Sequence, residues 1–585
     1  MTHERRWFPL TGAVSHVRDA VPAEFRTPGS VDPLSGPPVA LAGRVVTMND
    51  SFTVLPDAIV YCDRGVIVAV QERARPAPAG FAGVAVVETG GTIFPGLIDL
   101  HNHLSYNALP LWSPVPRRFE HRGQWPGHQD YRPLVSGPMT VFGRYQDDQD
   151  RYPLLAPLVR YVECKCLLGG VTTSQGLRLA SNAGIQRFYR GIVRNVEQTD
   201  DPELAEAQGR IPDLAAKDAR RFLDRLKREQ SCFLLHLSEG VTDPSQPLSM
   251  ARKHFLALEV APGEWALNKS FTGIHAAGLL PADFDVLARH GSSMIWSPLS
   301  NLLLYGGTAR VDAAKASGVT IGLGSDWSPT GSKNLLGEMK VAWLHSQQAL
   351  NGAFSARDVV AMATRNAARI LKWDKKAGGI EVGKRADLLV VGSTVADPYD
   401  ALIRAKETDI RLVMINGLAR YGVPEVMKSL VPDDETIRVG GQLRRLFLKQ
   451  ETSDPDVAQV PLNSATTQLR EALRDIAKLA KEIEKPRPTL SRRALDGPPV
   501  WSLALDEIAS SGVELGPRLP FDGPHDVTGT DRTSPTAALS PPLSTILKPV
   551  DLDPLTVADD GKFLEKIAQQ LNLQAPLKTG LQGLY

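Results

Sequence analysis

The chain has 585 residues, and its 66 basic and 65 acidic side chains give a formal net charge of +1. This balance argues against nucleic acid or an anionic membrane as a partner and favours a small-molecule substrate. Because the sequence contains neither an apolar run of roughly 18 residues nor an apolar block of signal-peptide type near its start, we expect a cytoplasmic protein without a membrane segment. One hydrophobic core rarely grows beyond about 250 to 300 residues, so the length predicts more than one domain.

The first and last parts of the central region have a similar β-rich pattern. Residues 38–92 alternate short apolar runs, such as Ala58-Ile-Val-Tyr-Cys, with polar turns. The same pattern returns within 376–430, where Ile410-Arg-Leu-Val-Met-Ile ends in a turn. These features predict that the two segments pair into one small β-sandwich domain. The four cysteines are too few for a disulfide framework and are expected to be buried thiols.

Residues 93–375 alternate apolar strand candidates with amphipathic helices. This order is typical of parallel βα units, which form either a barrel or a doubly wound sheet within the α/β class. We predict seven strands, at 94–101, 170–175, 187–195, 232–238, 271–275, 292–297 and 319–325. An eighth strand would complete a barrel and is expected near 209–214, before a helix at 215–229.

Two further segments lie outside this pattern. Residues 104–150 form a long insertion rich in proline, arginine and aromatic residues, which we interpret as a lid, with a flexible surface loop as the alternative. Residues 431–585 form a C-terminal extension, partly helical, with amphipathic helices predicted at 469–483 and 562–571 and a linker-like composition at 515–550. The extension would either cover the barrel or bind another subunit, and in the second case the protein would form a homo-oligomer.

Two histidines, His101 and His103, end the first apolar strand. Side chains of a strand alternate between its faces, so these two imidazoles project the same way while Asn102 points opposite. The pair is compatible with a metal site and also with two hydrogen-bonded histidines beside a core.

Four more polar residues stand where later apolar strands stop: His236, Glu239, His275 and Asp326. Each has an ordinary explanation when it is taken singly; Asp326, for example, would serve as a helix N-cap. In a barrel, however, the C-terminal ends of the strands meet at one mouth, which brings such residues together. Their shared position therefore indicates one site.

The chain resembles the amidohydrolase superfamily of metal-dependent hydrolases, over roughly residues 38–430. Within that superfamily it resembles the mononuclear branch of cytosine and guanine deaminases and chlorohydrolase-like enzymes, which places a glutamate three residues after the third histidine. The motifs that carry the resemblance are Phe94-Pro-Gly-Leu-Ile-Asp-Leu-His-Asn-His, Gly169-Gly-Val-Thr-Thr, His236-x-x-Glu239, His275, Ser297-Pro-Leu-Ser-Asn, Gly324-Ser-Asp326 and Ala377-Gly-Gly-Ile-Glu-Val-Gly-Lys-Arg-Ala-Asp-Leu-Leu-Val.

The resemblance implies a (β/α)8 TIM-type barrel over 93–375, flanked by the composite β-sandwich. It implies one divalent metal ion, zinc first and iron or manganese as alternatives, held by His101, His103, His236 and Asp326. Glu239 and His275 would transfer protons and orient the water, with Asp326 assisting. The activated water would hydrolyse a C–N bond of a small heterocyclic substrate, by deamination or by amide or cyclic-amide hydrolysis.

The pocket departs from the family pattern. Trp296 and Ser297 stand where many relatives have a histidine or cysteine, and Trp327 follows the last aspartate. We therefore expect Trp327, Ser297 and Asn301 to contact a substrate other than a standard nucleobase.

Two alternatives stay open. In a binuclear cyclic-amidase-type hydrolase, a carbamylated lysine would bridge two ions, but the candidate Lys165 lies in a predicted helix. In a non-enzymatic barrel scaffold, metal ligands should be missing, yet the sequence retains a full set.

Overall fold

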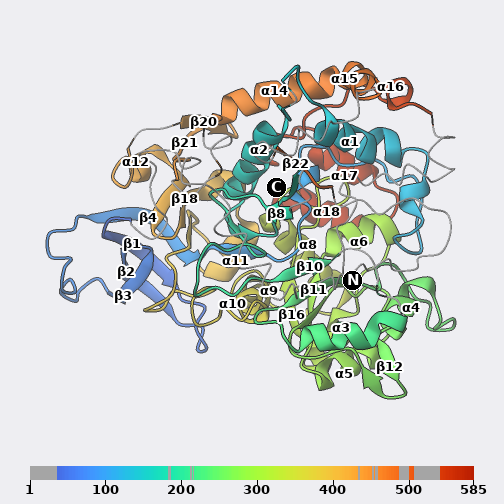
Figure 1. Ribbon diagram of the computed structural model, residues 1–585. Helices are drawn as coiled ribbons and strands as arrows, with labels where there is room; N and C mark the ends of the chain where they lie inside the picture. Colours follow the sequence, from blue (N-terminus) through green and yellow to red (C-terminus); the bar gives the residue numbers. More distant parts are fainter. Residues whose placement is uncertain are drawn as a thin grey trace, which may run out of the picture.

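Two assemblies of strands with helices around them make up the computed structural model, in which the C-terminal helices also lie against the central part (Figure 1). Among the residues that the structure describes, no helix combines the length and apolarity needed to cross a bilayer. The structure describes residues 36–149, 151–181, 186–210, 214, 216–432, 435–450, 454, 459–485, 500–505 and 541–585.

One nine-stranded sheet joins the two predicted β-rich segments, seen at the left of Figure 1 as blue and gold strands. Its order is β20-β21-β19-β18-β17-β4-β1-β2-β3, and the segments meet where β4 pairs antiparallel with β17. The strands are β1 (Val39–Val46), β2 (Val54–Asp63), β3 (Val66–Glu72), β4 (Val86–Pro95), β17 (Leu388–Val391), β18 (Ile410–Ile415), β19 (Leu418–Gly422), β20 (Glu435–Val439) and β21 (Gln442–Leu446). The sheet therefore extends past residue 430, where we expected it to end.

Alternate side chains of this sheet form one apolar cluster. Val60 of β2, Leu388 of β17 and Met414 of β18 are all fully buried in it, although they come from both halves of the sheet. Period-two alternation places such residues on one face, and burial of that face holds the two sequence segments together.

Eight parallel strands form two further sheets, of three and five strands. They are β5 (Leu97–Asp99), β6 (Val171–Ser174), β9 (Arg194–Asn195), β10 (Gln208–Arg210), β11 (Phe233–Leu237), β14 (Phe271–His275), β15 (Ser293–Trp296) and β16 (Thr320–Leu323). Backbone hydrogen bonds also run between the two sheets. Ala207 N donates to Val196 O at 2.8 Å on one side, and Leu100 N donates to Leu323 O at 3.2 Å on the other.

Three of the strand predictions need correction. The run 94–101 is not one strand, because its first residues belong to β4 of the large sheet, the strand is interrupted at Gly96, and β5 belongs to another sheet. A Cβ atom at Gly96 would lie 2.3 Å from Thr172 Cγ2. The run 187–195 divides into β8 (Gln186–Phe188), part of a small separate sheet, and β9. The strand expected near 209–214 is β10, which begins at Gln208; residues 211–213 lie outside the described part.

Helices connect and surround the parallel strands, because each offers an apolar stripe to them. The helix expected at 215–229 is shorter, at Ala219–Leu226. The helices of this region and of the large sheet are α2 (Leu155–Leu168), α3 (Ala219–Leu226), α4 (Met250–Leu256), α5 (Pro281–Arg289), α6 (Pro298–Tyr305), α7 (Val311–Ser317), α8 (Leu335–Ala349), α9 (Ala356–Met362), α10 (Arg365–Ile370), α11 (Pro398–Arg404) and α12 (Pro424–Met427).

The insertion after β5 packs as a compact unit rather than as a loose surface loop. It contains a π-helical turn (Arg132–Ser136) and α1 (Gly137–Arg144), and its aromatic residues Trp112, Phe119 and Trp125 are buried. All four cysteines are buried and free, as the sequence predicted.

The described part of the C-terminal extension covers the body of the molecule. It contains α14 (Leu462–Arg474), α15 (Ile476–Ile483), β22 (Trp501–Leu503), α16 (Leu543–Ile546), α17 (Phe563–Gln569) and α18 (Ala575–Leu584). Helix α14 packs on α2, and α18 packs on α8. The buried Gln570 also bonds to the insertion: its Oε1 accepts from Val115 N and its Nε2 donates to Trp112 O, both at 3.0 Å. Of the linker-like stretch 515–550, residues 515–540 lie outside the described residues.

Candidate metal centre

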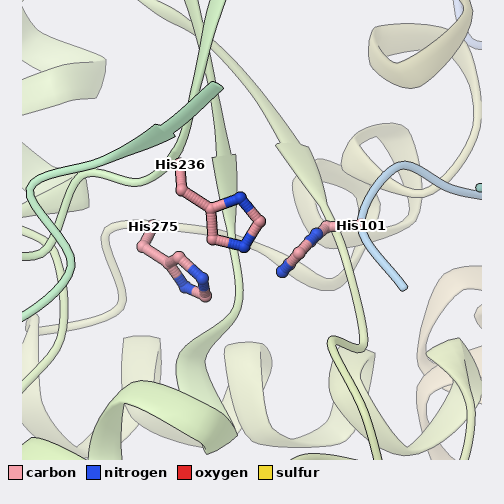
Figure 2. A group of neighbouring side chains, drawn as sticks. All are labelled: His101, His236 and His275. Atoms are coloured by element: carbon pink, nitrogen blue, oxygen red, sulfur yellow. The ribbon is translucent and has the colours of Figure 1, made fainter. Parts of the chain in front are cut away.

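The six residues predicted for catalysis and metal binding come together at one edge of the parallel strands. His101 and His103 follow β5, His236 lies in β11, and His275 ends β14. Figure 2 shows the rings of His101, His236 and His275 pointing toward one another. Ligand atoms of these three lie within 4.8 Å of one another, as do those of His101, His103 and Asp326.

The donor atoms suit a divalent cation. Asp326 Oδ1 lies 3.3 Å from His101 Nε2 and 3.6 Å from His103 Nε2. His101 Nε2 is buried and has no hydrogen bond of good geometry within the described residues. Buried polar atoms normally have a partner, so an ion is a physically reasonable one here. Imidazole and carboxylate donors fit zinc, iron or manganese, and these residues therefore fit the predicted ion.

Gln175 fixes the proton position on His101. The Gln175 amide orientation is set because Oε1 accepts from Asn102 N at 3.2 Å while Nε2 donates to Glu197 Oε1 at 3.0 Å. The same Oε1 lies 3.0 Å from His101 Nδ1, which must therefore donate. In the neutral ring this leaves a lone pair on His101 Nε2, which is the form that binds a metal. Burial alone would lower the pKa of His101, but the Asp326 carboxylate outweighs burial and raises it, so a metal ion would have to displace the proton from Nε2.

Glu239 sits at the centre of a second set of contacts. Its Oε1 accepts from Tyr305 Oη at 2.7 Å, and this hydroxyl accepts from Trp125 Nε1 of the insertion at 2.9 Å. Its Oε2 lies 3.7 Å from His275 Nε2. Burial raises the pKa of Glu239 to about 7, although the nearby Arg122 acts in the opposite direction. A carboxyl group with such a pKa can take up and release a proton near neutral pH.

His275 is oriented from behind by Asn301. Asn301 Nδ2 lies 3.1 Å from His275 Nδ1, and Asn301 Oδ1 accepts from Thr308 Oγ1 at 3.3 Å, so the amide nitrogen is the donor. His275 Nε2 then carries the proton and directs it toward Glu239. Burial lowers the pKa of His275 well below its ordinary value, and His101 adds to this effect, so the ring stays neutral.

The electrostatics of Asp326 differ from those of Glu239. Burial alone would raise the pKa of Asp326, but the positive charge of His101 in its protonated form outweighs burial and brings the pKa of Asp326 below the usual range. Asp326 is therefore an ionised carboxylate, as a metal ligand must be.

Four residues in or next to the site adopt the left-handed backbone conformation although they are not glycine. They are Ser238, His275, Ala276 and Asp326, with φ of 49°, 68°, 50° and 63°. Such conformations cost energy and persist where the surroundings hold them. Asp326 is held on both sides, since its N donates to His101 O at 2.9 Å and its O accepts from His103 N at 3.0 Å.

The insertion lies directly over Glu239. Arg122 N donates to Glu239 O at 3.2 Å, and Val241 N donates to Glu120 O at 2.8 Å. Arg122 itself is only 2% exposed, whereas Arg117 and Arg118 are exposed. These contacts agree with the interpretation of the insertion as a lid, which stays a prediction.

A cavity opens beside His103 and His236, and it is lined by residues that sequence reasoning did not select: Gln175, Arg178, Phe188 and Glu197. Burial raises the pKa of Glu197 to about 7. The Arg178 guanidinium lies 5.8 Å from the centre of the Phe188 ring.

Two of the three residues predicted to bind substrate contact the histidine cluster. Trp327 is 6% exposed and meets His103 edge to face, with ring centres 5.8 Å apart. Ser297 and Asn301 are fully buried, and Asn301 contacts His275. None of the three lines the cavity beside His103.

Lys165, which the binuclear alternative would need as a ligand, lies in α2. Its Nζ donates to Asp553 Oδ2, Ser328 Oγ and Asn107 O. All of its protons are thus engaged away from the histidine cluster, which argues against a bridging role.

Histidine and aspartate donors gathered at the ends of parallel strands are typical of a metal-dependent enzyme of the α/β class. Residues 250–419 match the amidohydrolase family. A 5-methylthioadenosine/S-adenosylhomocysteine deaminase of Symbiobacterium thermophilum is 35% identical over 393 residues, which are 60% of this chain and 84% of the relative. The deaminase of the same name from Halalkalibacterium halodurans is 26% identical over 365 residues, 56% of this chain and 78% of the relative.

The chain belongs to the amidohydrolase family. It is a hydrolase that acts on carbon–nitrogen bonds other than peptide bonds. Among solved structures, the atrazine chlorohydrolase of Arthrobacter aurescens TC1, in complex with zinc, aligns with a TM-score of 0.52 at 20% identity over 74% of this chain and 99% of its own. That likeness supports a TIM-barrel-type α/β fold.

Proposed function

We propose that this protein is a mononuclear metal-dependent deaminase that releases ammonia from an amino-substituted heterocycle. The observation that carries the proposal is the arrangement of Glu239 between Tyr305 and His275, beside the four donors His101, His103, His236 and Asp326. The names of the two relatives favour an adenine-type nucleoside as the substrate class.

Each residue would have one task in this reaction. When bound, a divalent cation supplies Lewis acidity, which lowers the pKa of water. Glu239 takes a proton from the attacking water and delivers it to the heterocycle, because its pKa is near 7. His275 donates from Nε2 and stabilises negative charge on the attacking oxygen, while Asp326 accepts the second water proton, which then passes to the departing amino group. A C–O bond forms, the C–N bond breaks and ammonia leaves.

We further propose that the eight parallel strands close into a complete (β/α)8 barrel over residues 93–375. The backbone hydrogen bonds between β16 and the segment after β5, and between the segments flanking β9 and β10, support this closure. Closure would place all six site residues around one mouth. The substrate would then occupy the cavity lined by Arg178, Phe188 and Glu197. These residues, rather than those expected from the sequence, would contact it.

An ammonia-release assay with the full chain tests the function. The substrates are 5′-methylthioadenosine, S-adenosylhomocysteine, adenosine, guanine, cytosine and a cyclic amide, each with zinc-loaded wild type and with Glu239→Gln as the matched control. We expect release from at least one amino-heterocycle by the wild type and almost none by the variant. Hydrolysis of the cyclic amide alone would refute deamination but keep a C–N hydrolase. No turnover of any substrate by a zinc-loaded chain would favour the scaffold alternative.

A further inference from the structure

A buried group of four charged side chains joins the C-terminal extension to the neighbourhood of the metal centre. Asp553 accepts from Lys165 Nζ at its Oδ2 and from Lys333 Nζ at its Oδ1, both at 2.5 Å. Lys333 also pairs with Asp560 at 2.9 Å. The four side chains are each no more than 7% exposed, and their charges cancel. We call these four residues the Asp553 cluster.

Lys165 is completely satisfied in this cluster. Besides Asp553, its Nζ donates to Ser328 Oγ at 2.7 Å and to Asn107 O at 2.9 Å. An ammonium group has three protons, so each has an acceptor and the head group has one position. Asp553 N also donates to Ala108 O at 2.9 Å, and Tyr161 Oη donates to Asp553 O at 2.6 Å, so the aspartate is fixed by its backbone as well.

Apart from Asp553, the acceptors of Lys165 belong to Asn107 and Ser328, and further hydrogen bonds connect these two residues to the metal centre. Asn107 Oδ1 accepts from Ser328 N at 2.9 Å, and Asn107 Nδ2 donates to Asn102 Oδ1 at 2.8 Å. Asn102 stands between His101 and His103, and Ser328 stands two residues after Asp326. Asn102 Nδ2 in turn donates to Asp99 Oδ2 at 3.0 Å and to Ser325 Oγ at 3.1 Å. Hydrogen bonds thus run without a gap from Asp553 to the residues next to the ligands.

The hydrogen bonds from Asn107 and Ser328 stabilise a segment whose backbone conformation at Asp326 is unfavourable. Asp326 has φ of 63°, which a residue other than glycine adopts only when its surroundings impose it. Residues that orient metal ligands from outside the coordination sphere commonly change metal affinity 10- to 100-fold when they are altered.

We propose that Asp553 is a positioning residue of the metal centre. Through Lys165 it fixes the two backbone segments that carry three of the four proposed ligands. The C-terminal extension then supports the site in addition to covering the body of the molecule. This inference rests on the proposed function, because it requires that those residues bind a metal.

Zinc affinity tests the proposal separately from stability. The zinc dissociation constant is measured by chelator competition on the full chain, together with the midpoint of thermal unfolding, for wild type, Asp553→Asn and Asp201→Asn. Asp201 is a matched control, because it forms a buried bidentate pair with Arg385, at 2.6 and 2.9 Å, that none of the contacts above connects to the ligands. Ser328→Ala is a further variant that removes the hydroxyl next to Lys165 without changing any charge.

We expect Asp553→Asn to weaken zinc binding at least about tenfold, Ser328→Ala about threefold, and Asp201→Asn less than twofold even where it lowers the unfolding midpoint. Zinc affinity of Asp553→Asn within twofold of wild type would overturn the positioning role and leave the proposed function intact. If Asp553→Asn does not fold, an unchanged zinc affinity of Ser328→Ala overturns it. A wild-type chain that binds no zinc would refute the metal centre, and the positioning role with it.

Discussion

The metal centre and the core of the nine-stranded sheet are built in opposite ways. The metal centre gathers buried polar side chains on strained backbone, as at His275 and Asp326, and hydrogen bonds hold them in place. The core of the sheet contains apolar side chains such as Val60 and Leu388 in regular strands. Functional sites often sacrifice stability for geometry, whereas a core gains stability from burial. Changes in the two regions should therefore have separable effects.

The largest effect on activity is expected from His101→Ala combined with His103→Ala. The double variant removes two of the four proposed ligands, so it should lose the metal and all turnover while the sheet remains folded. Elemental analysis, ammonia release and far-ultraviolet circular dichroism of the same preparation measure the three quantities. Full metal content and full activity in the double variant would show that these two histidines do not bind a metal that the reaction needs.

Glu239→Gln should lower turnover by roughly 10²- to 10⁴-fold, because the amide cannot carry a proton. Metal content should stay at the wild-type level, since Glu239 is not among the proposed ligands. Steady-state kinetics with parallel metal analysis checks both expectations. Activity close to wild type, with the metal present, would show that another group transfers the proton.

Tyr305→Phe should lower turnover by about tenfold. It removes the hydroxyl that donates to Glu239 Oε1 and accepts from Trp125, so Glu239 loses a charge-assisted hydrogen bond but keeps its proton chemistry. The Michaelis constant should change less than the turnover number. An effect on the Michaelis constant alone would assign Tyr305 to substrate binding instead.

Leu388→Ala should have the smallest effect on activity and the largest on stability. Leu388 is fully buried in the core of the sheet, and truncating such a side chain costs about 2–5 kcal/mol of unfolding free energy. Denaturant unfolding measures this loss. Turnover and metal content per folded chain should be unchanged, and a drop in either would mean that the sheet supports the metal centre directly.

The residues of the candidate site could be selected from the sequence because most of them stand near the ends of apolar runs, where strand periodicity is easiest to recognise. His101 and Asp326 follow such runs, and His275 ends one. Family membership and the hydrolase class are confirmed, whereas the roles of individual residues stay predictions.

Other parts of the site could not be predicted, because tertiary packing alone brings them together. Tyr305 reaches Glu239 from a helix 66 positions further along the chain, and Asp553 reaches Lys165 from 388 positions away. No local pattern marks either residue. Gln175 did have a signal, since it ends the run Gly-Val-Thr-Thr-Ser-Gln after a strand. The break of the first strand at Gly96 depends on close packing against Thr172, which periodicity does not reveal.

The number of divalent ions bound by each chain tests the central claim most directly. Inductively coupled plasma mass spectrometry of the dialysed full-length protein, with zinc, iron and manganese summed, gives this number. One equivalent per chain is the result that we predict from His101, His103, His236 and Asp326. Two equivalents would support the binuclear alternative, and none would contradict a metal-dependent mechanism at this site.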